Sequence, residues 1–121
     1  MTNEISYNLT IQLTNGLLTD SFASQARTAD QAAAALVRNV QNVGFAAHEA
    51  LGLGSLSTPG WGVFMNLDDT NFIEVGIDVG ATFYPFLHLE PGDVQMGRLA
   101  AVPYALADTA AVDLWYVIYE E

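Results

Sequence analysis

The stretch NLDDTNFIEVGID, residues 66–78, gathers side chains that could do oxygen chemistry. Three kinds of site use such a set. Calcium takes six to eight oxygen ligands, and glycoside hydrolysis uses two carboxyl groups on either side of a cleft. A turn uses the same residue types to hydrogen-bond its own backbone. The side chains concerned are Asn66, Asp68, Asp69, Asn71, Glu74 and Asp78.

The spacing within this stretch favours the turn. Asp68-Asp69-Thr70 lies between two apolar runs, so we interpret it as the turn of a hairpin. The loop lacks the spacing and the internal glycine of a helix-loop-helix calcium site. A carboxylate pair such as Asp69 and Glu74 needs a cleft for which a small sandwich has little room. An ion site at Asp68, Asp69 and Asn71 remains the alternative.

His88-Leu89-Glu90 has the spacing of a histidine and a carboxylate on one strand face, as in a small cupin-like metalloenzyme. That face can equally be the one that meets solvent. The other histidine, His48, stands beside Glu49, and sequence neighbours point apart in a strand. The chain has no cysteine, which excludes disulfides, thiolate metal sites and cysteine nucleophiles. We therefore predict no catalytic residue, metal site or cofactor, and a protein that is not an enzyme.

The composition narrows the class of partner. The 121 residues fit one domain and carry a formal net charge of −11, from 14 acidic and three basic residues. So few arginines exclude phosphate-based binding to nucleic acid or to an anionic membrane. Hydrophobic residues make up 51% and charged residues 14% of the chain, which predicts a rich core and an apolar surface covered in part by partners.

The N-terminal third begins with a clear strand signal. Apolar and polar residues alternate over residues 5–14, which predicts a half-buried strand with Leu9 and Ile11 buried together. Asn15-Gly16 then predicts a tight hairpin turn, because both residue types tolerate positive φ. The alanine-rich run ADQAAAA favours one short helix near residues 28–36, and LVRNVQNVG after it is typical of a strand.

Six further strands are predicted from Trp61 onward. Short apolar runs alternate with turn-rich segments, a pattern typical of an all-β protein rather than of βαβ units. We predict a single-domain antiparallel β-sandwich or jelly roll over residues 1–121. Pro85 cannot donate to a ladder, so its strand should be an edge strand or bulged there.

The closing strand VDLWYVIYE is apolar on both faces. One core can cover only one face of a strand, so the other face should meet a neighbouring chain. Aromatic residues anchor such contacts. The candidate interface residues are Trp115, Tyr119, Tyr116 and Trp61.

Residues 51–121 contain the stretches LGSLSTPGWGVFMNLDDTNFIEVGID, FYPFLHLEPGD, RLA and YALADTAAVDLWYVIYEE. With these stretches the segment resembles small virion proteins of tailed bacteriophages. The resemblance implies a small β-sandwich or jelly roll, often trimeric, that acts as a capsid decoration (cement) protein. Its partners would be the major capsid protein or another virion protein and copies of itself, in a virion assembled in the host cytoplasm. A tail or fibre-tip module that binds a host surface glycan is the alternative.

Overall fold

The computed structural model describes residues 4–31 and 34–121, and these residues form strands and no helix. None of them therefore lies in a helix that could cross a membrane. The chain divides into two compact units, residues 1–33 and 34–121. We expected one domain over residues 1–121; the sandwich itself lies within the second unit.

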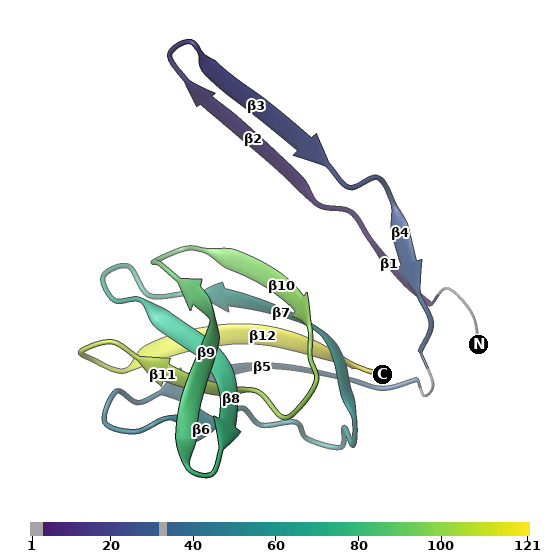
Figure 1. The fold of residues 1–121 in the computed structure, drawn as a ribbon. Coiled ribbons are helices and arrows are strands. Elements are labelled where there is room, and N and C mark those ends of the chain that lie inside the picture. Colours follow the sequence, from purple (N-terminus) through teal and green to yellow (C-terminus); the bar gives the residue numbers. More distant parts are fainter. Residues whose placement is uncertain (1–3, 32–33) are drawn as a thin grey trace. The chain divides into compact units, whose positions relative to one another are not determined.

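Two four-stranded antiparallel sheets face each other in the second unit (Figure 1). The first has the order β10 (Val94–Arg98), β7 (Pro59–Asn66), β12 (Val112–Glu120), β5 (Leu36–Val43). The second has the order β6 (Glu49–Ala50), β11 (Tyr104–Ala107), β8 (Ile73–Val79), β9 (Thr82–Leu89). Counted from β5, the orders are 6-3-8-1 and 2-7-4-5, which is the strand arrangement of a jelly roll. The predicted all-β sandwich is confirmed.

The core lies between the two sheets and follows the alternation of each strand. In β12 every second residue from Val112 to Ile118 is fully buried. Phe64 of β7 and Ile73 of β8 are also fully buried, and they belong to opposite sheets. Large branched and aromatic side chains of the two inner faces thus fill one apolar layer, whose burial drives folding of this unit.

Pro85 lies where its chemistry allows. Its strand β9 is an edge strand of the second sheet, and the register of β8 with β9 shifts between Val75 and Gly76, next to Pro85. Both features that the sequence predicted for this strand are therefore present, because a proline can neither donate to a ladder nor fit a regular central strand.

The first unit is a ribbon of two antiparallel strand pairs. Its strands are β1 (Ile5–Tyr7), β2 (Thr10–Asn15), β3 (Leu18–Ala23) and β4 (Arg27–Ala29), with β1 paired to β4 and β2 to β3. Asn15 pairs with Leu18 across the turn, and Gly16 has φ of 59°. The predicted hairpin is confirmed, but its two turn residues are Gly16 and Leu17 rather than Asn15 and Gly16, and Gly16 alone of these has positive φ.

The expected burial of this hairpin was wrong. Every residue of β2 and β3 is exposed, and Leu9 and Ile11 are 45% and 59% accessible. The single strand predicted over residues 5–14 is two strands, β1 and β2, and a two-stranded ribbon has no second layer of its own to bury one side. Because Leu9 is exposed, Leu9→Ala should cost less than the truncation of a core leucine.

The short helix near residues 28–36 is also absent from the described residues. Arg27–Ala29 is strand β4, in which Ala29 pairs with Ile5, and β5 begins at Leu36. Residues 32 and 33 of the predicted helix lie outside the described residues. A helix this short is marginal even when it is alanine-rich, so strand pairing on both sides outweighs the propensity of the alanines.

Candidate functional site

Residues 66–71 form a turn that is held by its own side chains. The Asp68 carboxylate accepts hydrogen bonds from the backbone N–H groups of Thr70 (3.0 Å) and Asn71 (2.6 Å). Asn66 is buried, and its amide donates to the carbonyl oxygens of Asn71 (2.9 Å) and Leu89 (3.1 Å). The Asp68 N–H donates to Asn66 Oδ1 (2.8 Å). The oxygen-rich stretch thus satisfies local backbone donors.

The sequence predicted that this turn closes a hairpin, and that prediction is wrong. The turn leads from β7 in the first sheet to β8 in the second, so it crosses the sandwich. The sequence could not reveal this, because a turn between strands of one sheet and a turn between two sheets use the same residue types. Asn71 bonds further to Thr109 Oγ1, at the turn before β12 (2.9 Å).

These bonds lower the pKa of Asp68, chiefly through the N–H of Asn71 and then that of Thr70. A carboxyl whose folded pKa is depressed stabilises the protein above its unfolded pKa, and the stabilisation is lost as pH falls through the folded value. We expect Asp68→Ala to lower the melting temperature from pH 5 to 8, roughly evenly, and the deficit to shrink below about pH 4.

The matched control is Asp69→Ala, because Asp69 accepts only from the Thr70 hydroxyl beside it in the turn. It should change the melting temperature less than Asp68→Ala at every pH. Thermal melts with and without a calcium chelator complete the measurement. If a chelator lowers the melting temperature of the wild type, the turn interpretation is wrong and Asp68, Asp69 and Asn71 form an ion site.

Both histidines lie on the outer side of the second sheet, each beside carboxylates. His88 Nε2 is 3.0 Å from Glu90, and its Nδ1 is 3.4 Å from Glu74, the residue with which it pairs across β8 and β9. Hydrogen bonds that His88 donates to the carboxylates of Glu90 and then Glu74 raise the pKa of His88. His48 Nε2 is 2.6 Å from Asp78, and this bond is the largest cause of the lowered pKa of Asp78. We name this side, with Glu74, Asp78 and Glu90, the acidic face.

The acidic face brings His88 and Glu90 together, as the sequence predicted from their spacing. Among residues 4–31 and 34–121, no group of three or more histidine, aspartate or glutamate side chains could hold a metal ion. His88 is also exposed, so the pair lies on an open surface rather than in a cleft. The arrangement suits a solvated, hydrogen-bonded face better than a cupin-like metal centre.

The outer side of the first sheet has a different character. Cross-strand register places the side chains of this outer side next to one another in rows across the four strands. Arg98 of β10 pairs with Trp61 of β7, and Tyr119 of β12 pairs with Leu36 of β5. Most of them are apolar or aromatic; the exceptions are Arg38 and Arg98, and Asn42 and Asp113, which pair with each other at one end of β5 and β12. We call the apolar part of this surface, together with the two arginines, the tryptophan face; it comprises Leu36, Arg38, Val40, Trp61, Val63, Met65, Val94, Met96, Arg98, Trp115, Val117 and Tyr119.

The structure separates the four candidate interface residues. Trp61, Trp115 and Tyr119 lie on the tryptophan face and are partly accessible. Tyr116 points the other way into the core, where it is fully buried and its hydroxyl donates to the carbonyl oxygen of Gly52 (2.7 Å). Strand alternation had already assigned Tyr116 to the opposite face from Trp115.

The sequence did not single out the arginines of the tryptophan face. The Arg38 guanidinium lies 6.0 Å from the ring centre of Trp115, and that of Arg98 lies 5.9 Å from the ring centre of Trp61. Arg98 is also 3.6 Å from the Glu121 carboxylate. The scarcity of basic residues was a usable signal, since two of the three in the chain lie on this one surface.

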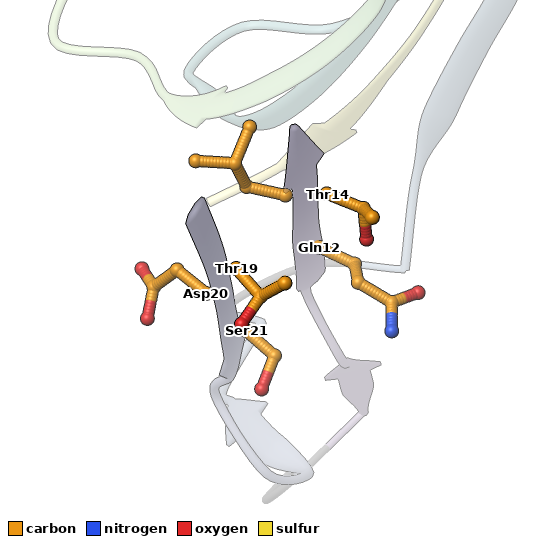
Figure 2. Close-up of a pocket in the computed structure, with 6 residues that line it drawn as sticks. Gln12, Thr14, Thr19, Asp20 and Ser21 are labelled. Atoms are coloured by element: carbon orange, nitrogen blue, oxygen red, sulfur yellow. The ribbon is translucent and has the colours of Figure 1, made fainter. Parts of the chain in front are cut away.

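The ribbon of the first unit offers a third surface. One side carries Ile11 opposite Phe22 and Leu13 opposite Asp20, while the other carries Gln12 opposite Ser21 and Thr14 opposite Thr19. An open hollow of about 480 Å³ on the ribbon is lined by Gln12, Leu13, Thr14, Thr19, Asp20 and Ser21 (Figure 2). Its labelled residues come from both strands and are polar, and the hollow is open, which suits solvent rather than catalysis.

Comparison of the chain with protein-family models, curated proteins and solved structures finds no match.

Proposed function

We propose that the chain is a non-enzymatic structural protein of a tailed-bacteriophage virion, namely a capsid decoration (cement) protein that binds the assembled shell and stabilises it. The observation that carries the proposal is the ribbon, whose apolar side chains are exposed. The resemblance of residues 51–121 to small virion proteins supplies the virion context. The jelly roll agrees with it at the level of fold alone, because this fold also serves lectins and cupins.

The apolar side of the ribbon would become buried when the ribbon binds a partner. Ile11 and Phe22 lie opposite each other and are 59% and 54% accessible. A lone two-stranded ribbon is at best marginally stable in water, so a partner that covers its apolar side also orders it. An assembled shell presents such partners in a regular array, namely the major capsid protein or another virion protein.

The acidic face suits a second contact with the shell. Glu74, Asp78 and Glu90 lie on it in a chain of net charge −11. Opposite charges across an interface speed association and select the partner. Binding only to the assembled shell then stabilises that shell by mass action. The protein acts as a homo-oligomer, for which the resemblance favours a trimer.

The test is binding of purified protein to shells that lack it, followed by co-sedimentation and by the melting temperature of the shell. Wild type should bind and raise that melting temperature. Ile11→Ser and Phe22→Ser should each weaken binding about tenfold or more, because covering one large apolar side chain contributes about 1.5–3 kcal/mol. Gln12→Ser, on the polar side of the ribbon, is the matched control and should bind as wild type.

Two outcomes would overturn the proposal. Shells that neither bind the protein nor gain stability from it exclude a cement role. Specific retention on host surface glycans, with no affinity for shells, assigns the protein to the tail or a fibre tip instead.

A further inference from the structure

The tryptophan face is apolar over the full width of a four-stranded sheet. Leu36, Val40 and Val94 are exposed there, and Trp61 and Trp115 are partly accessible. Its two central strands, β7 and β12, have eight and nine residues. An apolar face of this kind marks a contact surface in a folded protein.

The size of the face fits a protein partner. The strands β10, β7, β12 and β5 have five, eight, nine and eight residues, and with about 3.3 Å per residue and about 4.8 Å between strands they project roughly 480 Å². Side-chain relief makes the accessible area larger than the projection. The accessible area buried when the whole face is covered therefore approaches the roughly 800 Å² per partner that stable complexes bury. A smaller occupant, such as a single strand or a sugar, would leave most of the face in water.

The charge of the face selects which protein fits. A second copy of this chain also carries −11, so two copies repel unless they meet where the local charge is balanced. Arg38 and Arg98 provide that balance on the tryptophan face, where the carboxylates are Glu121 beside Arg98 and Asp113 at the border near Trp115. The acidic face, by contrast, would place carboxylates against carboxylates.

We propose that copies of this chain associate through their tryptophan faces, with Trp61 and Trp115 at the centre of the contact and Arg38 and Arg98 near its edges. These residue types suit the positions. Tryptophan, tyrosine and arginine dominate the binding energy of protein interfaces. Arg38 lies on the edge strand β5 and Arg98 on the edge strand β10, where each can meet a carboxylate of the neighbouring copy.

Sedimentation equilibrium of the purified full chain over a concentration series tests the proposal. Wild type should form an oligomer, and its mass gives the number of copies. Trp115→Ala should raise the dissociation constant at least about 30-fold, as truncation of an interface anchor does. Circular dichroism confirms that each variant is folded.

A second pair of variants avoids any change to packed aromatics. Val40 on the tryptophan face and Val79 at the end of β8 are 48% and 58% accessible. Val40→Glu and Val79→Glu each add one negative charge at a comparably exposed valine. Val40→Glu should dissociate the oligomer, whereas Val79→Glu should leave its mass unchanged. A monomeric wild type, or equal effects of the two substitutions, would refute the proposal.

The salt dependence of self-association is an independent test of the proposed interface. Screening of the repulsion between two acidic chains should strengthen self-association as the salt concentration rises from about 0.02 M to 0.5 M. Weaker association at high salt would mean that attraction between opposite charges, rather than apolar cover, dominates the contact, and would contradict an interface centred on Trp61 and Trp115. No shell protein is present in these measurements. Failure of shell binding and failure of self-association are therefore separate results.

Discussion

Gly76→Ala should abolish the native pairing of β8 with β9. A Cβ atom at Gly76 would collide with the backbone oxygen of Tyr84 and lie 2.6 Å from Cα of Pro85. Both atoms are backbone, so no rotamer change relieves the overlap, and β9 has to move away. The register shift beside Pro85 depends on this close approach. We expect a loss of about 3 kcal/mol or more in the free energy of unfolding, at or above the upper end for overpacked sites.

Gly97→Ala is the matched control for that substitution. Gly97 is also a strand glycine, in β10, and a Cβ there meets no atom within 4 Å. It should change the free energy of unfolding by about 0.5 kcal/mol or less. Urea unfolding of both variants measures the difference. Equal stabilities of the two variants would mean that β9 does not lie against Gly76 as described.

Asn66→Ala is expected to have the second largest effect. Asn66 is 1% accessible, and its side chain joins the end of β7 to the carbonyl oxygens of Asn71 and Leu89. Truncation removes these bonds together with the acceptor for the Asp68 N–H. Each buried polar group that loses its partner costs about 1–3 kcal/mol, so the expected total is about 3 kcal/mol.

Asn42→Ala controls for the loss of an asparagine side chain. Asn42 is exposed, and its side-chain amide donates to the Asp113 carboxylate (2.9 Å). It should cost about 0.5 kcal/mol or less. Urea unfolding again measures both. A small effect at Asn66 would show that water replaces its bonds and that the crossing turn is not fixed by this side chain.

Strand positions were the part of the fold that the sequence could predict. Residues such as those of VDLWYVIYE and NFIEVGID are β-branched or aromatic and are bounded by turn-forming residues, and these signals are local. Which strands share a sheet is a non-local property. The turn at Asp68 therefore suggested a hairpin, whereas the chain crosses to the other sheet there.

The ribbon shows the limit of periodicity. Alternation predicts correctly which side chains of β2 share a side, because that depends on strand geometry alone. It does not say whether a second layer covers that side. Leu9 and Ile11 alternate like core residues and are nevertheless exposed, so a sequence pattern cannot distinguish a core face from a docking face.

The tryptophan face was predictable in part. Both faces of the closing strand are apolar, and alternation places Trp115 and Tyr119 on the same face. This follows from the sequence of one strand. The contributions of β5, β7 and β10 depend on register between distant strands, which aligns Arg38 and Arg98 with the tryptophans. No pattern within one strand contains that information.

Cryo-electron microscopy of virions that carry a labelled copy of this chain tests the central claim most directly. A cement protein should add density on the outer surface of the capsid, repeated with the symmetry of the shell lattice. Particles that lack the protein should lose that density and become less stable to heat. Density confined to the tail or fibre tips, or virions without the chain, would contradict the account.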